Sequence, residues 1–279
     1  MKTKLIAIGS GIVILGYAAA SIVPGLFNRR GYTPDEIRRL TVVAHRGGAA
    51  LEPENTLRAI ERGIACGADM IEIDIHQTAD GAIVVCHDPT VDRTTDGSGT
   101  IADMTLDEIR ALHITDADGR PTDLRIPTLD DVLALVDGRA RLLVEIKRPK
   151  GVYEGIEQRM LDAFARHGAE DWVVVQSFND DVLEITHHLN PDIRLEKLLI
   201  CKLRGMPYIF DGSLTRFDYN KYAHVASFNF FSPAVTRGMV DELHAHGKEV
   251  KIWTLDAPAD APHLPVDGII TDHPDLWKR

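Results

Sequence analysis

Three acidic residues stand in short β-prone runs of the sequence. Glu72 and Asp74 alternate with isoleucines in the run 71–75, so both carboxylates leave one face of a strand and the isoleucines leave the other. Glu145 stands in a second apolar run, 142–146. Carboxylates held this close share a proton or bind a cation, and a third carboxylate from another strand favours a hard cation, Mg²⁺ or Ca²⁺. The alternative, solvated charges on a half-exposed strand, does not fit the flanking isoleucines.

Two histidines also follow β-prone runs. His45 follows residues 41–44 and stands next to Arg46, and His87 follows residues 83–86. Imidazole exchanges a proton readily near neutral pH, and a guanidinium group suits bidentate binding of a phosphate. A single histidine at such a position would more often be a packed core residue, but the pair with an adjacent arginine favours a functional site.

Lys147, Gln176 and Trp253 complete the set of candidate residues. Lys147 lies two positions after Glu145, so its ammonium group shares a face with that carboxylate. Lys147 could be a structural counter-ion, or it could neutralise charge on a phosphoryl transition state. Gln176 and Trp253 end further strands. Gln176 could bond an oxygen of the substrate or of a ligand carboxylate, and Trp253 could form an apolar wall, although a packing role is open for both.

From residue 41 onward, β-prone runs alternate with amphipathic helical segments, which is typical of βα units and a parallel sheet. Eight such runs indicate the α/β class and a (β/α)8, or TIM, barrel, whose active site lies at the carboxyl ends of the strands. The expected strands are 41–44, 70–75, 142–146, 172–176, 193–198, 224–228, 250–253 and 268–271, and the clearest helical segments are 56–66, 153–167, 180–189 and 233–246.

Two stretches break this alternation. Residues 77–137 follow the second strand and hold Gly-rich and Asp-rich loops with short helices at 106–112 and 129–135. We expect them to form an insertion on the catalytic side of the barrel. Residues 201–222 are too long for an ordinary βα loop, and we expect them to cover the mouth of the barrel.

Length and charge limit the class of protein. With 279 residues, of which 44% are hydrophobic and 26% charged, the chain can form one large barrel domain. The formal net charge of -11 opposes binding to nucleic acid, so we expect no nucleic-acid partner. The three cysteines lack CxxC spacing and are expected in the core. Nothing in the sequence predicts the oligomeric state.

The amino terminus has the composition of a membrane segment. Residues 5–27 carry no charge, lie between lysines and arginines, and are long enough to cross a bilayer. We expect residues 1–30 to anchor the protein in a membrane, residues 31–40 to form a linker helix, and residues 41–279 to form a catalytic domain that could be exported. The alternative is a signal peptide cleaved near the alanines at 18–20, which would leave a secreted or periplasmic protein.

Ten short motifs, in this order, resemble those of the glycerophosphodiester phosphodiesterase family over roughly residues 45–274. Each motif alone is weak, but the ordered set is specific. The motifs are His45-Arg46-Gly47, Glu54-Asn55-Thr56, Glu72-Ile73-Asp74, Thr78-Ala79-Asp80-Gly81, His87-Asp88, Asp92-Arg93-Thr94-Thr95, Glu145-Ile146-Lys147, Gln176-Ser177-Phe178, Trp253-Thr254 and Asp267-Gly268-Ile269-Ile270-Thr271-Asp272.

The resemblance implies a TIM-barrel hydrolase that uses a divalent metal to cut a glycerophosphodiester into an alcohol and sn-glycerol 3-phosphate. The attacking group could be water or the glycerol hydroxyl of the substrate itself. By this resemblance the metal ligands are Glu72, Asp74 and Glu145, the acid/base pair is His45 and His87, and the phosphate is held by Arg46 and Lys147.

Two departures from the family pattern stand out. The family commonly has Trp-Thr-Val-Asn where this chain has Trp253-Thr254-Leu255-Asp256, and the last helix of the barrel is cut short after Pro274. The first departure could alter an outer contact to the leaving alcohol. The second concerns closure of the barrel more than chemistry.

Three rival functions compete with this one. A lysophospholipase D would cut lipid diesters, which the expected anchor makes plausible. A non-catalytic barrel that binds phosphodiesters would need the phosphate site but no acid/base pair. A zinc hydrolase would need histidine ligands, but the only close histidine clusters, His187-His188 and His244-Ala245-His246, fall on expected outer helices.

Overall fold

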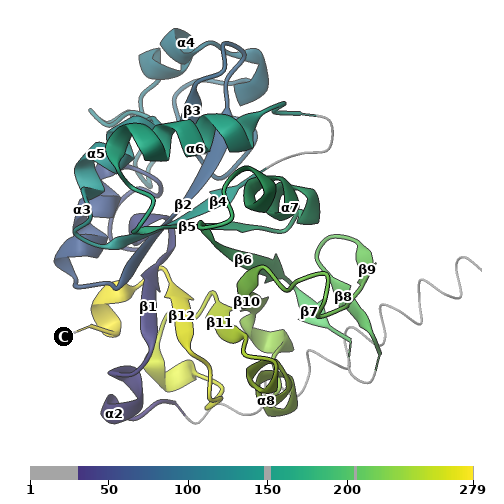
Figure 1. Cartoon of the computed structure of the whole chain (residues 1–279). Coiled ribbons are helices and arrows are strands. Elements are labelled where there is room, and N and C mark those ends of the chain that lie inside the picture. The colour runs from purple at the N-terminus through teal and green to yellow at the C-terminus, as the bar shows by residue number, and fades with distance from the viewer. Residues whose placement is uncertain (1–30, 148–151, 204–205, 279) are drawn as a thin grey trace, which may run out of the picture.

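The structure, a computed structural model, describes residues 31–147, 152–203 and 206–278 (Figure 1). Eight parallel strands form a closed barrel, because β1 pairs with both β2 and β12 and the others pair with their neighbours. The expected (β/α)8 barrel is confirmed, and each strand lies close to its predicted position. The barrel strands are β1 (Thr41–Ala44), β2 (Met70–Gln77), β4 (Arg141–Ile146), β5 (Val173–Ser177), β6 (Arg194–Leu199), β10 (Val225–Phe231), β11 (Glu249–Trp253) and β12 (Gly268–Thr271).

Helices pack around the outside of the barrel (Figure 1). Four of them begin at a Thr or Asn whose side chain accepts a hydrogen bond from a backbone N–H of the first turn, a strong N-cap. Within the described residues the ring is incomplete, since no α-helix follows β6, β11 or β12. The five helices are α3 (Leu57–Ala65), α5 (Leu129–Val136), α6 (Ile156–His167), α7 (Asp180–Leu189) and α8 (Arg237–Ala245).

Alternation along the strands separates two buried layers. On β2 the side chains of Ile71, Ile73 and Ile75 face the helices and join the large outer core. Met70 faces inward instead and packs against apolar side chains of β1, β4, β5 and β12 inside the barrel. These inner side chains close the lower part of the barrel, so the residues further along each strand line its open end.

The predicted insertion after β2 is confirmed as a small unit with its own core. The strand β3 (Ile83–Val85) pairs antiparallel with the end of β2. The 3-10 helix η2 (Ile101–Asp103) and α4 (Leu106–Ala111) follow. A separate apolar cluster holds the insertion together; its buried members are Val84, Cys86, Val91, Ile101, Ile109, Ile114 and Ile126.

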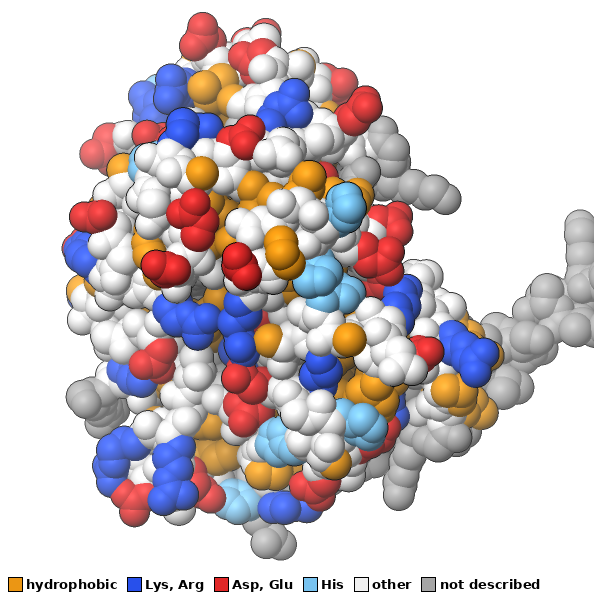
Figure 2. Space-filling view, viewed as in Figure 1, with side chains coloured by type: hydrophobic (Ala, Val, Ile, Leu, Met, Phe, Trp, Pro, Cys, Tyr) orange, Lys and Arg blue, Asp and Glu red, His pale blue; other side chains and the backbone are white. Residues whose placement is uncertain are grey.

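The surface mixes charges of both signs, as Figure 2 shows for the face seen in Figure 1. Many of these charges pair; Arg139 lies 2.7 Å from Glu61, for example. Exposed pairs of this kind contribute about 0–1 kcal/mol each. The stability of the fold therefore comes mainly from the two buried layers.

Residues 31–40 contain only one turn of helix, α2 (Pro34–Ile37). The turn is closed by a capping box in which Thr33 and Glu36 bond each other's backbone N–H groups. Before it, the Tyr32 hydroxyl donates to the carbonyl of Leu264 at 2.8 Å. The expected linker thus packs on the barrel domain.

The localisation expected from the sequence is corrected. Within residues 31–147, 152–203 and 206–278, no helix has both the length and the apolar character needed to cross a bilayer. The expected anchor and the alternative signal peptide fall on residues 1–30, which lie outside the described residues. A membrane anchor is therefore not supported, and the membrane-anchored, exported enzyme inferred from it is withdrawn.

Candidate active site

One cavity of about 220 Å³ lies at the carboxyl ends of the barrel strands. Eight of the nine candidate residues from the sequence line it, and the ninth, Asp74, lies fully buried. The structure thus brings together side chains that are far apart along the chain. The lining residues are His45, Arg46, Glu72, His87, Glu145, Lys147, Gln176, Phe178, Leu198, Trp253, Thr254 and Ile270.

Glu72, Asp74 and Glu145 form a buried acidic cluster. The parallel pairing of β2 with β4 sets Asp74 directly beside Glu145. One oxygen of each of the three carboxylates lies within 4.8 Å of the other two. The three residues are only 1%, 0% and 6% exposed, respectively. Such a group could hold a metal ion.

Burial and mutual repulsion shift the pKa values of this cluster. Burial, together with the charge of Asp74, raises the pKa of Glu72 to about 8. Burial and Asp74 also raise the pKa of Glu145 to about 7, although Lys147 opposes the shift. Burial acts in the same sense on Asp74, but Lys147 and Arg46 outweigh it and hold the pKa of Asp74 below its ordinary value. Without a further cation, Glu72 is therefore the carboxyl of this cluster that most favours its protonated form.

Two side-chain cations balance part of the charge. Lys147 Nζ lies 2.7 Å from Glu145 Oε1 and 3.2 Å from Asp74 Oδ1. Arg46 Nε lies 3.5 Å from Asp74 Oδ2. Three carboxylates still outnumber two cations, and Asp74 Oδ1 is buried with an ion-pair contact to Lys147 but without a hydrogen bond. The cluster therefore fits one more cation, and its oxygen ligands suit a hard divalent ion.

His45 is held by a carboxylate at the end of another strand. It begins the turn η1 (His45–Gly47), and its Nδ1 lies 2.6 Å from Asp272 Oδ1. An ionised carboxylate only accepts, so Nδ1 carries the hydrogen and Nε2 is free to exchange a proton. Burial tends to lower the pKa of His45, but Asp272 and Glu72 outweigh it and raise the pKa above its ordinary value. Asp256, the departure from the family pattern, accepts from the Asp272 amide at 3.2 Å and so supports this pair.

His87 has a similar partner next to it in the chain. Its Nδ1 lies 2.7 Å from Asp88 Oδ1, and Arg93 Nε donates to Asp88 Oδ2 at 2.6 Å. Burial lowers the pKa of His87, and the charge of Lys147 adds to the shift. The two histidines therefore have pKa shifts of opposite direction.

A chain of ion pairs connects the partner of His87 to Arg46. Arg93 binds Glu54 through both terminal nitrogens, at 2.7 and 3.0 Å. The same carboxylate accepts from Arg46 Nη1 at 2.9 Å. Asp88, Arg93 and Glu54 thus fix one candidate proton-transfer group and one candidate phosphate-binding group relative to each other.

The turn that carries His45 and Arg46 sits directly on α3. Gly47 has a φ of 85°, and a Cβ at this position would lie 2.7 Å from two backbone atoms of α3. From the other side, a Cβ at Gly63 of α3 would lie 2.5 Å from the Gly47 carbonyl oxygen. Only glycine fits at both places. This contact fixes how far His45 and Arg46 reach into the cavity.

Gln176 and Trp253 are both held by polar contacts. Gln176 Nε2 donates to Glu72 Oε1 at 3.3 Å, so it contacts an acidic residue of the cluster. Trp253 Nε1 donates to the carbonyl of Asn229 at 3.0 Å, and its ring meets that of Phe178 edge-on. The apolar wall of the cavity consists of Phe178, Leu198, Trp253 and Ile270.

Sequence reasoning missed the residue that orients Asp74. Asn55 Nδ2 donates to Asp74 Oδ2 at 2.9 Å, and its Oδ1 accepts from the Asp74 amide at 3.2 Å. Asn55 has a φ of 57°, which asparagine tolerates better than most residues. The motif Glu54-Asn55-Thr56 was visible in the sequence, but nothing in it indicates this contact. Asp272 and Arg93 also stand in recognised motifs, and their contacts were not predicted either.

The segment 201–222 does not take the place expected of it. It forms a three-stranded antiparallel sheet of β7 (Cys201–Lys202), β8 (Tyr208–Phe210) and β9 (Leu214–Arg216). None of its described residues lines the cavity. The prediction that this segment covers the mouth of the barrel is therefore wrong for the part that the structure describes.

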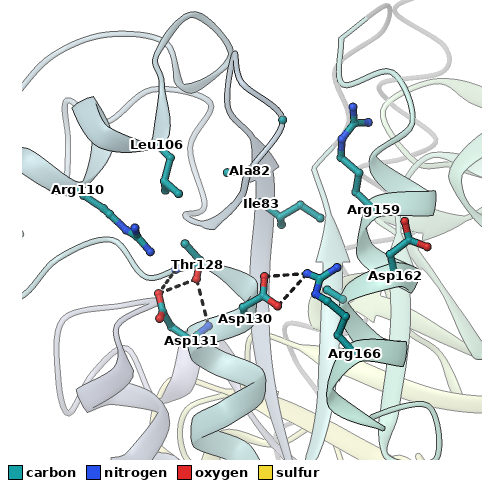
Figure 3. A pocket seen from close by; sticks show the side chains of 12 residues that line it. Ala82, Ile83, Leu106, Arg110, Thr128, Asp130, Asp131, Arg159, Asp162 and Arg166 are labelled. Atoms are coloured by element: carbon teal, nitrogen blue, oxygen red, sulfur yellow. Dashed lines mark hydrogen bonds and ion pairs between the residues drawn. The ribbon is translucent and has the colours of Figure 1, made fainter.

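A second hollow, of about 420 Å³, lies outside the barrel between α4, α5 and α6 (Figure 3). Figure 3 shows Arg166 of α6 paired with Asp130 of α5, and Asp131 bonded to its own N-cap, Thr128. No histidine and none of the candidate residues lines this hollow. It is a seam in which opposite charges join two helices, whereas the candidate residues lie at the mouth of the barrel.

Fold and site together define a TIM-barrel enzyme with a buried acidic cluster and two carboxylate-paired histidines. The chain belongs to the glycerophosphoryl diester phosphodiesterase family, whose model matches residues 45–276. It is accordingly a phosphoric diester hydrolase, and its substrate class is a small glycerophosphodiester.

Known relatives agree with this family. A glycerophosphodiester phosphodiesterase of Caldanaerobacter subterraneus subsp. tengcongensis is 35% identical over 84% of this chain and 94% of its own length. The crystal structure of a glycerophosphodiester phosphodiesterase from Agrobacterium tumefaciens is 27% identical, covers 85% of this chain and 98% of its own, and has a TM-score of 0.68. A phosphodiesterase of Oleispira antarctica, solved in complex with the product sn-glycerol-3-phosphate, is 24% identical with a TM-score of 0.70, covering 84% and 94% of the two chains.

Proposed function

We propose that the protein hydrolyses glycerophosphodiesters to an alcohol and sn-glycerol 3-phosphate. The observation that carries the proposal is the single cavity in which a buried acidic cluster, two carboxylate-paired histidines and two side-chain cations meet. The negative charge of a phosphodiester repels a nucleophile, so hydrolysis needs positive charge at the phosphoryl group and groups that move protons. The cavity offers both. The product complex of the Oleispira antarctica relative supports the choice of product.

The acidic cluster is proposed to hold one divalent ion, Mg²⁺ or Ca²⁺, through Glu72, Asp74 and Glu145. A divalent ion bound there polarises phosphoryl oxygens and offsets the charge that develops on them. The excess of negative charge and the raised pKa of Glu72 support this role, because a cation can take the place of the proton on that carboxylate.

Arg46 and Lys147 are proposed to bind the phosphoryl oxygens. Nη1 of Arg46 bonds Glu54 and its Nε lies near Asp74, whereas its Nη2 has no hydrogen bond within the described residues. That nitrogen is available to a substrate oxygen. Lys147 lines the same cavity, and its neighbouring carboxylates raise its pKa despite burial, so it stays charged.

His45 and His87 are proposed to move the protons. One histidine takes a proton from the attacking group, and the other gives a proton to the departing alkoxide. Asp272 and Asp88 keep a hydrogen on each Nδ1, so exchange takes place at Nε2 of each ring.

The cavity favours a small substrate. Its volume of about 220 Å³ is below the roughly 300–1,000 Å³ of typical ligand pockets. A glycerophosphoryl group suits this space, with its carbon atoms against Trp253 and its phosphoryl group toward Arg46. The acyl chain of a lysophospholipid would have to lie outside the cavity.

Release of the head-group alcohol, choline or ethanolamine, from a panel of diesters tests the proposal. The phosphate product that identifies the reaction is sn-glycerol 3-phosphate from a glycerophosphodiester, whereas a lysophospholipid gives an acylated glycerol 3-phosphate. The panel contains glycerophosphocholine, glycerophosphoethanolamine and lysophosphatidylcholine, each with chelator and with chelator followed by Mg²⁺ or Ca²⁺. We expect release from the first two, loss of activity with chelator and recovery with one of the ions. Activity that is indifferent to chelation contradicts the metal role, and a preference for the lysophospholipid contradicts the substrate.

Removal of either histidine tests the proton-transfer roles. H45A and H87A should each lower kcat by about 100-fold or more, the loss expected without a general acid or base. H188A, which removes an exposed histidine of α7, is the matched control and should retain kcat. Near-normal turnover in H45A and H87A would exclude both from the mechanism.

A further inference from the structure

A continuous chain of buried polar side chains crosses the barrel behind Glu72. Gln176 Nε2 donates to Glu72 Oε1 at 3.3 Å, and Gln176 Oε1 accepts from Asn229 Nδ2 at 2.9 Å. Asn229 Nδ2 also donates to Glu196 Oε2 at 2.8 Å, and Lys251 Nζ donates to Glu196 Oε1 at 2.6 Å. Four neighbouring strands, β5, β6, β10 and β11, supply the four residues of this chain.

The hydrogen bonds of this series can run in only one donor-to-acceptor direction, because the residues at its far end have fixed roles. The ionised carboxylate of Glu196 only accepts, and Lys251 only donates. Asn229 must therefore turn its NH2 group toward Glu196. Its two hydrogens then serve Glu196 and Gln176, while its oxygen accepts from the Ser227 hydroxyl at 3.0 Å.

The direction of these hydrogen bonds also determines how the Gln176 amide faces the acidic cluster. Because Asn229 donates to it, Gln176 must present its amide oxygen to Asn229 and its NH2 group to Glu72. An NH2 group is a partner for a carboxylate, whereas an amide oxygen in that place would repel it. The orientation of one amide next to Glu72 is thus set by an ion pair on the other side of the barrel.

Burial makes other orientations of these amide groups unfavourable. Gln176, Glu196, Asn229 and Lys251 are each at most 2% exposed, so water cannot replace a lost partner. A buried polar group without a partner is costly, which makes an alternative orientation of any one amide unfavourable unless the others turn as well.

We infer that Glu196, Asn229 and Lys251 are positioning residues, which hold the Gln176 amide with its NH2 group toward Glu72 and so fix Glu72 for binding a divalent cation. The inference rests on the proposed function in one respect, the assignment of Glu72 as a metal ligand. It assigns Gln176 to the support of the acidic cluster. None of the three positioning residues lines the cavity.

Glu196→Gln tests the direction of these hydrogen bonds, because the substituted side chain has nearly the same shape but no charge. Lys251 only donates, so the new amide must turn its oxygen toward Lys251 and its NH2 group toward Asn229. Asn229 then has to accept, and Gln176 has to turn its oxygen toward Glu72. We expect the dissociation constant for Mg²⁺, Ca²⁺ or Mn²⁺ alone, measured by calorimetry, to rise about 10-fold or more, as when an outer partner of a metal ligand is lost.

Asp211→Asn is the matched control for removing a buried carboxylate from a lysine. Lys197 Nζ donates to Asp211 Oδ2 at 2.8 Å, and both side chains are nearly inaccessible, but neither contacts the acidic cluster. D211N should lower the thermal midpoint without changing the metal dissociation constant beyond about twofold. Metal affinity that falls equally in E196Q and D211N would reduce the effect to general destabilisation and overturn the inference.

A double variant completes the test. In the background of Gln176→Leu, which weakens metal binding by removing the last link, E196Q should have no additional effect on the dissociation constant. If E196Q does not fold, Asn229→Leu breaks the same link and should weaken metal binding as Q176L does. Unchanged affinity in Q176L, or additive effects in the double variant, would contradict the inference.

The outcomes separate this inference from the proposed function. An ion that binds the wild-type chain and is lost in Glu72→Gln, yet binds E196Q and N229L normally, overturns the inference alone. If no ion binds the wild-type chain, or if Glu72→Gln leaves the affinity for the ion unchanged, the metal assignment is overturned and the inference with it.

Discussion

Three of the candidate side chains are each held by a second polar residue, which determines the atom that is left for reaction. Asp272 holds Nδ1 of His45, Asp88 holds Nδ1 of His87, and Asn55 holds one oxygen of Asp74. In each case the partner leaves one defined atom for substrate, proton or metal. Activity should therefore depend strongly on residues that never touch the substrate.

Arg93 is the clearest example, because its three nitrogens bond both the carboxylate that holds His87 and the carboxylate that holds Arg46. Its Nε holds Asp88, and its terminal nitrogens hold Glu54. Arg93→Gln should lower kcat/KM by about 10-fold, less than the roughly 100-fold that a 1 Å misplacement of a reacting group can cost. Steady-state kinetics with glycerophosphocholine measure the change.

Arg58 supplies the matched control for Arg93. Its side chain is 48% exposed, against 47% for Arg93, and it pairs with Glu52 at 2.7 Å without a contact to either histidine. Arg58→Gln should leave kcat/KM within about twofold, as expected for an exposed pair of low energy. Equal losses in R93Q and R58Q would show that Arg93 has no special role.

Two kinds of structural element position the site: the barrel strands, whose carboxyl ends surround the cavity, and the turn η1, which packs on α3. Parallel pairing of β2 with β4 brings Asp74 beside Glu145 without help from any loop. The turn η1 has no such ladder, and its position rests on the close approach of Gly47 to α3. The histidine and arginine on this turn are therefore the part of the site most sensitive to helix packing.

Gly47→Ala tests that dependence. A Cβ would meet α3 backbone at 2.7 Å, and the φ of 85° adds strain. We expect a loss of about 2–4 kcal/mol in the free energy of unfolding, from overpacking and left-handed strain together, and a large fall in kcat. Denaturant unfolding and kinetics on the same preparation measure both.

Gly67→Ala isolates the strain from the clash. Gly67 has a φ of 78°, but the nearest atom to an added Cβ is a lysine side-chain carbon at 4.0 Å. G67A should lose only about 1–2 kcal/mol, the cost of a left-handed Cβ. A loss in G67A as large as in G47A would mean that packing of the turn on α3 contributes nothing.

For the whole molecule, the sequence predicted the barrel because eight β-prone runs recur with helical segments between them. It pointed to the nine candidate residues mainly because unusual polar types stand at strand ends, and eight of the nine line one cavity. Contacts between side chains distant in the sequence, such as Asn55 with Asp74, follow from the fold and have no local pattern. For the same reason, residues 201–222 were misplaced, since short β-prone runs do not show which face they join.

The charge of the cluster should also make the stability of the whole chain depend on pH when the divalent ion is removed. Folding raises the pKa of Glu72 from 4.5 to about 8 and that of Glu145 from 4.5 to about 7. Between these values the folded chain binds more protons than the unfolded chain, so the free energy of unfolding falls as pH rises. Each carboxyl adds to this pH dependence only between its unfolded and its folded pKa.

Thermal unfolding of the wild-type chain and of Glu72→Gln, in chelator and in Mg²⁺ or Ca²⁺, measures this dependence between about pH 5 and pH 8. In chelator the wild-type midpoint should fall relative to E72Q as pH rises, because only the wild-type chain has to give up the proton on residue 72. The ion replaces that proton, so its stabilising effect should be larger at the upper end of the range than at the lower end. A wild-type midpoint that rises relative to E72Q, or ion stabilisation that is equal at both ends, would mean that repulsion among these carboxylates does not govern what the site binds.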